Sequence, residues 1–346
     1  MKTVKERIYD YLKEQGRQVS VTEVAKGGDF GARPYVSKML RQLLEERRVK
    51  CIRIGRYVYY ELDTAEVLID EDVILSGLDD ELYWSRLNDD GGFFSEMSEQ
   101  AKNAIYFGFT EMLNNAVDHS KSGAGYVKIW HDDGKVRFIV RDRGIGVFRN
   151  VMVRKGFDNV MTAIQNLLKG KLTTMPAFHS GEGIFWTSKI ADKFVLSSYD
   201  YRLTVDGKLD DYMVEKIGEE EMVLGTMVYF EISEDTTKSL SELFREYSFD
   251  KKSASLDETV IPVKLYEEGE VWISRSQAKK VLAGLEKFKR VVFDFKGIKF
   301  IGQGFADEIF RVFNIQHPEI ELEAINMSDD VRMMVEHARN DWVGRD

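Results

Sequence analysis

The chain has 346 residues, which is more than one hydrophobic core usually organises, so we expect two or three domains. Its residues are 43% hydrophobic and 31% charged, a balance that is typical of a globular protein and excludes a disordered chain. The single cysteine, Cys51, excludes an internal disulfide and a cysteine zinc cluster. Because the sequence has neither a secretory signal core nor an apolar run long enough to span a bilayer, we expect a cytoplasmic protein without a membrane partner.

Charge is distributed unevenly along the chain. The formal net charge of −10 argues against non-specific nucleic-acid binding by the whole surface, because phosphate repels an acidic body. Residues 1–65, however, contain 14 Lys and Arg against 9 Asp and Glu, a balance of +5, and the remaining residues carry −15. A basic head therefore precedes an acidic body.

Residues 1–65 have the pattern of a small DNA-binding fold. Apolar residues recur at helical spacing over Val4–Leu12, a short second helix is predicted near Val21–Ala25, and a third begins at Pro34. Two strand-like runs then flank a turn at Gly55–Arg56. Three helices followed by a two-stranded ribbon predict a winged helix. The third helix is expected to bury its apolar residues, which are Val36, Met39, Leu40, Leu43 and Leu44.

The other face of the third helix and the ribbon carry the residues for a nucleic-acid contact. Lys and Arg, which bind phosphates and base edges, are in local excess here. If the third helix enters a major groove and the ribbon reaches the flanking backbone, the candidate DNA-binding residues are Arg33, Lys38, Arg41, Arg53 and Arg56. A winged fold that serves only as a protein adaptor is the alternative.

Four further segments follow the head. Residues 66–92 are acidic and less patterned, and we interpret them as a connector. Residues 93–232 are mixed α/β, and 233–257 form a charged linker. Residues 258–346 alternate strand-like and helical runs, as in a small α/β domain. The pattern as a whole predicts a multidomain protein of the α+β and α/β classes.

Three helices are predicted within the last segment: the last covers Asp329–Arg339, and the first two have informative patterns. One covers Arg275–Phe288, and Ser274 with Gln277 forms a capping box at its start. The other covers Gly304–Ile315 and buries apolar residues at core spacing. We expect three charged residues to form its solvated face, namely Asp307, Glu308 and Arg311.

Four short motifs occur in order within residues 93–232. Glu111 and Asn115 are four apart at the end of a predicted helix, so both side chains lie on one face and can address one ligand. Asp142 follows a strand-like run and can accept a hydrogen bond from an exocyclic amine, while Gly144 and Gly146 let the backbone approach a ligand. The two later motifs contain Gly181, Gly183 and Thr226.

The later motifs suit a phosphorylated ligand. Gly181 and Gly183 occur where a helix begins after a loop, and the free N–H groups at such a start favour phosphate. Thr226 enters a strand. The chain contains neither a G-x-x-x-x-G-K-[ST] motif nor an H-R-D catalytic loop, which excludes a P-loop and a protein-kinase catalytic loop.

In this order, the motifs resemble the N, G1, G2 and GT boxes of the GHKL superfamily over roughly residues 93–232. Members include gyrase B subunits, mismatch-repair ATPases, heat-shock chaperones, histidine kinases and anti-sigma-factor kinases. The resemblance implies a Bergerat α/β sandwich that binds ATP and Mg²⁺. By this resemblance, Asn115 ligates Mg²⁺, Asp142 holds the adenine amine, and Gly144 and Gly146 shape the nucleotide floor.

The same resemblance assigns the phosphate end of the pocket. It implies that Gly181 and Gly183 contact phosphates and that Thr226 supports Asp142. Glu111 is then the general base that polarises the attacking water, a task that suits a carboxylate. Autophosphorylation of the histidine-kinase type is not expected, because no histidine precedes Glu111.

The tail, over about residues 258–340, resembles a STAS-like domain, the type found in anti-sigma-factor antagonists and transporter tails. Antagonists that are phosphorylated carry an Asp-Ser-Ser-Gly element in one turn, whereas this chain has Gly302-Gln303-Gly304-Phe305 and lacks the acceptor hydroxyl. The resemblance therefore implies a regulatory domain that docks a protein partner or senses the neighbouring ATPase.

Together these features predict a weak GHKL-type ATPase that acts as a nucleotide-driven switch, coupled to a winged-helix head and a STAS-like tail. Two alternatives are an anti-sigma-type serine/threonine protein kinase and an ATP-binding regulator without turnover. The sequence leaves open the DNA operator, the protein partner and the oligomeric state, a homodimer included.

Overall fold

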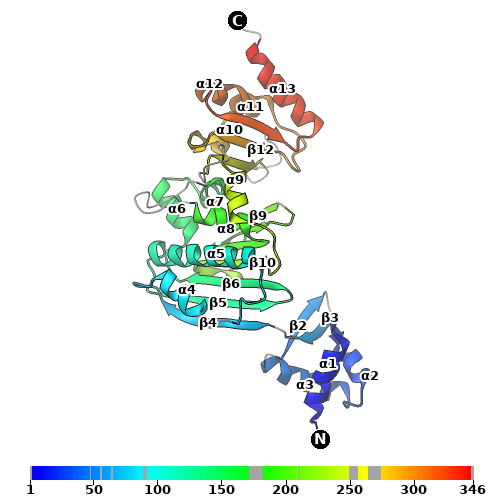
Figure 1. Ribbon diagram of the computed structural model, residues 1–346. Coiled ribbons are helices and arrows are strands. Elements are labelled where there is room, and N and C mark those ends of the chain that lie inside the picture. The colour runs from blue at the N-terminus through cyan, green and yellow to red at the C-terminus, as the bar shows by residue number, and fades with distance from the viewer. Residues whose placement is uncertain are drawn as a thin grey trace. The chain divides into compact units, whose positions relative to one another are not determined.

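The computed structural model describes residues 2–46, 48–54, 57–63, 65–88, 92–170, 182–209, 211–248, 256–263 and 274–343. They form two compact units (Figure 1): one is Met1–Glu66 with His131–Asp133, and the other is Val67–Trp130 with Gly134–Asp346. In the described part of the chain, no helix has both the length and the apolarity needed to cross a bilayer.

The first unit contains three helices and a small antiparallel sheet in the order β1-β3-β2. Its elements are α1 (Val4–Gln15), β1 (Val19–Ser20), α2 (Val21–Gly27), α3 (Arg33–Glu45), β2 (Val49–Ile54) and β3 (Tyr57–Leu62). Thr3 caps the start of α1, and Gly16 ends it in the left-handed region at φ 56°. The three predicted helices and the predicted ribbon are therefore present, and the short strand β1 adds a third strand.

Helix α3 buries one face and exposes the other. Val36, Met39, Leu40 and Leu43 are buried, as predicted from their spacing. The prediction that Leu44 is also buried is wrong, because its side chain is 36% exposed. Leu44 lies one position after Leu43, about 100° around the helix, and so leaves the buried stripe.

The larger sheet has seven strands in the order β4-β5-β6-β10-β7-β8-β9. Its strands are β4 (Glu66–Ile74), β5 (Ala124–Asp132), β6 (Lys135–Asp142), β7 (Lys193–Tyr199), β8 (Tyr201–Asp206), β9 (Asp211–Lys216) and β10 (Val223–Ser233). The central pairs β6–β10 and β10–β7 are antiparallel, so the end of β6 lies beside the start of β10. That edge brings Asp142 and Thr226 together from distant parts of the sequence.

Helices cover the sheet and supply its core. They are α4 (Asp80–Asn88), α5 (Glu99–His119), α6 (Val147–Lys155), α7 (Val160–Lys169), α8 (Gly183–Ile190) and α9 (Leu240–Glu246). Figure 1 shows α5 running alongside the strands, and α5 contacts β6 and β10. Phe109 of α5 packs edge-on against Phe138 of β6, and the Phe138 ring stacks on Phe230 of β10 at 4.7 Å.

Two segments that the sequence indicated as connecting regions carry regular structure. Residues 66–92 contribute β4 and α4, and residues 233–257 contain α9. In β4, Ile69 and Val73 are buried between acidic neighbours. Trp84 of α4 packs at 5.6 Å from the Phe109 ring. Because acidic residues dominate the composition of this segment, its few apolar residues did not predict a strand or helix from the sequence. They form β4 and α4 through strand pairing and packing.

The C-terminal part, from Glu258 to Val343, has a parallel sheet in the order β11-β12-β13. Its elements are β11 (Glu258–Pro262), α10 (Arg275–Leu282), η3 (Leu285–Lys287), β12 (Arg290–Asp294), α11 (Gln303–Asp307), the π-helix η4 (Glu308–Phe313), α12 (Asn314–Gln316), β13 (Glu321–Ile325) and α13 (Asp329–Val343). The predicted capping box at Ser274 is confirmed. Helix α10 ends before the predicted Phe288, because Gly284 follows in the left-handed region at φ 81°.

Helix α8 contributes side chains to two hydrophobic cores. Ile190 lies in the core under the large sheet, while Phe185 and Trp186 lie in the core of the C-terminal part. The Trp186 ring also contacts Phe244 of α9 at 4.6 Å. Helix α8 therefore joins the large sheet to the C-terminal part, because it contributes side chains to both hydrophobic cores.

Lys169, the last residue of α7, adds polar contacts to this junction. Its Nζ donates to the carbonyl oxygen of Ala283 at 2.7 Å, and its own carbonyl accepts from Oγ1 of Thr259 at 2.9 Å. The side chain is buried, and burial lowers the pKa of Lys169 to about 7. The folded state therefore favours the neutral amine, which can still donate the hydrogen bond to Ala283.

We predict that Trp186→Ala lowers the free energy of unfolding by about 3–5 kcal/mol, because a ring that α8 buries in the core of the C-terminal part is lost. Leu224→Ala is the matched control: Leu224 is 54% exposed, so a change within about 0.5 kcal/mol is expected. Urea unfolding of both variants measures the effect. A loss in Trp186→Ala no larger than the control's would show that the junction contributes little stability.

Candidate functional site

Asp142 ends strand β6 and is buried. Its Oδ1 accepts hydrogen bonds from the backbone N–H groups of Gly144, at 2.7 Å, and of Thr226, at 3.3 Å. Burial raises the pKa of Asp142, while the hydrogen bonds from Gly144 and Thr226 act in the opposite direction. The structure thus holds a carboxylate at the end of the central strands, where it can accept a donor group from a ligand.

The backbone approaches Asp142 closely because glycines stand beside it. Gly225 has φ 86°, and a Cβ on it would lie 2.7 Å from Oδ1 of Asp142. A Cβ on Gly144 would overlap the carbonyl oxygen of Ser120. Strand β10 also shifts register between Val223 and Thr226, which allows the chain to bend around the carboxylate. Side chains at positions 144 and 225 would therefore break the arrangement.

Gly146 and Thr226 join this region to α6. Gly146 is the N-cap of α6 with φ 78°, and a Cβ on it would meet Oγ of Ser198 and the ring of Tyr199. Oγ1 of Thr226 accepts from the N–H of Val147 at 3.0 Å. Thr226 therefore contacts Asp142 through its backbone and the start of α6 through its hydroxyl.

Sequence reasoning missed Ser198 and Tyr199 at the end of β7. The Tyr199 hydroxyl donates to the carbonyl of Gly144 at 3.0 Å, and the Ser198 hydroxyl donates to the carbonyl of Gly225 at 2.8 Å. The guanidinium of Arg149 lies over the Tyr199 ring at 3.9 Å. Motifs in the sequence did not indicate them, because these bonds depend on the pairing of β7 with β10.

Glu111 and Asn115 lie one turn apart on α5, and both are half-buried. A Cβ on Gly183, the first residue of α8, would overlap Oε2 of Glu111. The structure therefore brings the first and third sequence motifs into contact. The N–H groups in the first turn of α8, which have no acceptor within the helix itself, give this end of the site a preference for anions.

Some predicted residues do not enter this geometry. Gly181 and Arg56 lie outside the described residues. Arg33, Lys38 and Arg41 are exposed on α3, and Arg53 is exposed on β2. The candidate DNA-binding residues among them thus face solvent in the first unit.

Comparison with known protein families matches two segments of the chain. Residues 101–234 match the family described as histidine kinase-, DNA gyrase B-, and HSP90-like ATPase, and residues 277–332 match a STAS-like domain of unknown function. The comparisons found no significant match among curated proteins or among solved structures. The predicted GHKL-type ATPase domain and the predicted STAS-like domain are confirmed, and the chain is a mixed α+β multidomain protein.

We predict that Asp142→Asn leaves the folded protein as stable as the parent at neutral pH or more stable. Because the folded-state pKa of Asp142 is raised, the ionised carboxylate works against folding above that pKa. The amide keeps an oxygen for the bonds from Gly144 and Thr226 and removes the charge. The difference from the parent should shrink as the pH falls through the pKa of Asp142, since the acid then becomes neutral.

The control is Asp192→Asn. Asp192 is also buried, but its Oδ1 lies 3.1 Å from Nζ of Lys238, so removal of its charge should destabilise the protein. Denaturant unfolding of both variants at several pH values makes the comparison. A loss of stability in Asp142→Asn as large as that in Asp192→Asn would contradict the burial argument.

Proposed function

We propose that the protein is an ATP- and magnesium-dependent switch in which a GHKL-type ATPase domain (93–232) changes the state of a DNA-binding winged-helix head (1–65) and a STAS-like regulatory tail (258–346). One observation carries the proposal. Helix α8 begins with Gly183 against Glu111 and places Phe185 and Trp186 in the core of the C-terminal part. A nucleotide that contacts the start of α8 therefore acts on a helix that the tail shares.

The residues around Asp142 fit the adenine end of a nucleotide. The buried carboxylate accepts the exocyclic amine, and Gly144, Gly146 and Gly225 leave room that a Cβ would fill. The backbone N–H groups of Gly144 and Thr226 donate to Oδ1 of Asp142, so the carboxylate is oriented before the ligand binds. This fit supports ATP as the ligand.

The other end of the site fits phosphates and a hard cation. Asn115 offers a carboxamide oxygen to Mg²⁺, which prefers oxygen ligands and usually retains waters and substrate phosphates in its shell. Among the described residues, no three His, Cys, Asp or Glu side chains are placed to hold a metal, so the nucleotide itself supplies part of the ligand set. When bound, Mg²⁺ neutralises phosphate charge.

Glu111 is the proposed general base. It lies on the same face of α5 as Asn115 and beside the start of α8, where the terminal phosphate would be held. Its carboxylate would accept a proton from the attacking water. Gly183 matters to this role, because any larger residue there would displace the carboxylate.

The first unit has the element order of a winged helix, with α3 as the recognition helix and β2–β3 as the wing. The exposed cations of α3 and Arg53 of β2 are the proposed contacts, together with Arg56 from the sequence. Their positive charge is local, since the rest of the chain is acidic. This charge distribution supports DNA binding by the head over a role as a protein adaptor.

We predict that Asp142→Asn weakens ATP binding at least about tenfold, because an amide N–H replaces the charged acceptor of the adenine amine.

Glu111→Gln should retain ATP binding and lose hydrolysis by about 100-fold or more, since a general base acts on water and not on the bound nucleotide. Calorimetric titration and phosphate release measure the two quantities. Equal ATP affinity in parent and Asp142→Asn would refute the pocket, and unchanged turnover in Glu111→Gln would refute the base.

Incubation with γ-labelled ATP separates the proposed switch from its alternatives. An ATPase releases labelled phosphate and leaves the protein unlabelled. Transfer of the label to this protein or to an added STAS-domain protein would identify a kinase of the anti-sigma type. Binding without either product would identify a regulator that does not turn over ATP.

We predict that DNA binding weakens steeply with salt and that replacing both Lys38 and Arg41 by alanine reduces the slope of log affinity against log salt by about 2. Binding releases fewer counterions from the DNA for each phosphate contact that the variant has lost. Lys13→Ala is the control, because Lys13 is exposed on α1, away from the proposed recognition helix. Electrophoretic shifts with genomic fragments, with and without ATP, measure the slope. If no shift occurs at low salt in either nucleotide state, the head is a protein adaptor.

A further inference from the structure

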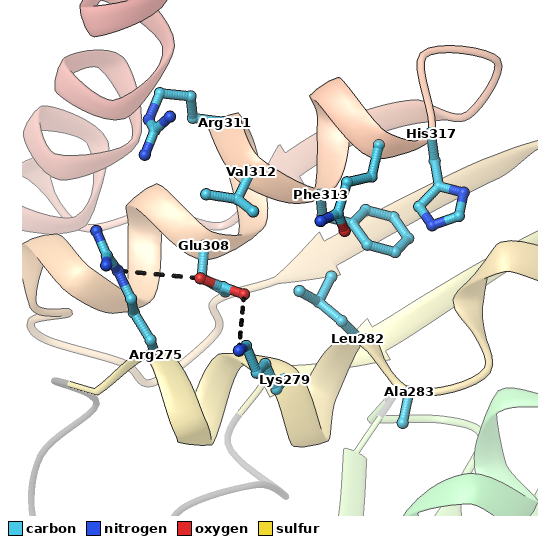
Figure 2. A pocket seen from close by; sticks show the side chains of 10 residues that line it. Arg275, Lys279, Leu282, Ala283, Glu308, Arg311, Val312, Phe313 and His317 are labelled. Atoms are coloured by element: carbon cyan, nitrogen blue, oxygen red, sulfur yellow. Dashed lines mark ion pairs between the residues drawn. The ribbon is translucent and has the colours of Figure 1, made fainter.

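A cavity of about 550 Å³ lies in the C-terminal part, between α10 and the π-helix η4 (Figure 2). Its volume falls in the range of small-molecule sites, about 300–1,000 Å³. Four of its ten lining residues come from η4. Because π-helical turns are rare and frequently occur at functional sites, the wall of this cavity is itself an indication of a ligand.

Glu308 stands at the polar end of the cavity. The prediction that Asp307 and Glu308 belong to a solvated helix face is wrong: both are buried, Glu308 with 8% of its surface exposed. The Glu308 oxygens lie 3.9 Å from Nε of Arg275 and 3.8 Å from Nζ of Lys279, beyond hydrogen-bond distance. Within the described ranges, no group donates a hydrogen bond to this carboxylate. Two cations therefore face this carboxylate, and neither donates a hydrogen bond to it.

Lys279 is the complementary group. Within the same ranges its Nζ makes no hydrogen bond, and its nearest opposite charge is Glu308. Arg275 and Arg311 differ, because both donate to Asp307, at 2.9 and 2.8 Å. The bond from Arg311 lowers the pKa of Asp307, so Asp307 stays ionised and balances part of their charge. The polar end therefore has an exposed cation and a buried anion that face each other at 3.8 Å without a hydrogen bond between them.

The other end of the cavity is apolar. Leu282 and Phe313 are buried, and the His317 ring lies 4.6 Å from the Phe313 ring. Figure 2 shows Leu282, Phe313 and His317 on the side away from Arg275. A ligand that fills the cavity must therefore carry charges at one end and an apolar group at the other.

We propose that this cavity binds a small zwitterion with an apolar body, of the chemical class of an α-amino acid with an aromatic or aliphatic side chain. The carboxylate of the ligand meets Lys279, its ammonium group meets Glu308, and its side chain packs on Leu282 and Phe313. A ligand with only a negative charge would meet Lys279 and leave Glu308 without a hydrogen-bond donor. A ligand with only a positive charge would meet Glu308 and leave Lys279 without an acceptor.

The test is calorimetric titration of the full chain without nucleotide, so that its outcome is independent of the proposed ATPase. L-Phenylalanine is the probe, and 3-phenylpropionate and phenethylamine are matched analogues that each lack one of its charges. L-Phenylalanine should bind at least about tenfold more tightly than either analogue, because each analogue leaves a cavity charge unpaired. This comparison uses only the parent protein and so requires no variant to fold.

Variants then assign the contacts. Lys279→Ala and Glu308→Gln should each weaken L-phenylalanine binding at least about fivefold, and Glu308→Gln should also remove the disadvantage of 3-phenylpropionate. Lys280→Ala is the control, because Lys280 is the next residue of α10 and does not line the cavity. Absence of binding at millimolar L-phenylalanine, or equal binding of 3-phenylpropionate by the parent, would overturn the proposal. Tighter binding of a glutamate-rich peptide that is lost in Lys279→Ala would assign the cavity to an acidic protein partner instead.

Discussion

The buried carboxylate of Asp142 constrains the whole site. It is removed from water at the end of β6, and backbone N–H groups of Gly144 and Thr226 provide its bonds. Those groups reach it only because Gly144 and Gly225 lack a Cβ that would collide with backbone or carboxylate atoms. Strand β10 bends around the end of β6, where Asp142 lies. The bulge in β10 permits this bend, and the hydrogen bond from Ser198 to Gly225 stabilises it.

Helix α8 extends this constraint to the C-terminal part. Its first residue, Gly183, touches Glu111 of the site, and its first turn buries Phe185 and Trp186 in a second core. Cores are close-packed and resist small displacements, so a helix held on both sides moves with both or not at all. This is the physical basis for coupling the proposed nucleotide site to the tail, and Lys169 adds a polar contact to the same junction.

The proposed amino-acid cavity borders that junction. Ala283, whose carbonyl accepts the hydrogen bond from Lys169, also lines the cavity.

The charges of the tail are arranged differently from those of the head. The lysine and arginines of α3 in the head are exposed to solvent, whereas Asp307 and Glu308 are buried beside cations. Charge at the surface suits recognition of a large polyanion, while buried charge suits a small ligand that brings its own hydrogen-bonding groups.

The sequence by itself determined the local features: helix periods and caps, and the ordered motifs containing Glu111 and Asp142, because these depend on neighbours a few residues apart. It also identified the ATPase and STAS-like segments through family resemblance. Only the tertiary structure decided that Glu66–Ile74 joins the large sheet as β4, since this strand gains its stability by pairing. It likewise placed Glu308 on the wall of a cavity, because α10, which is distant in sequence, packs against the π-helical turn that carries this residue.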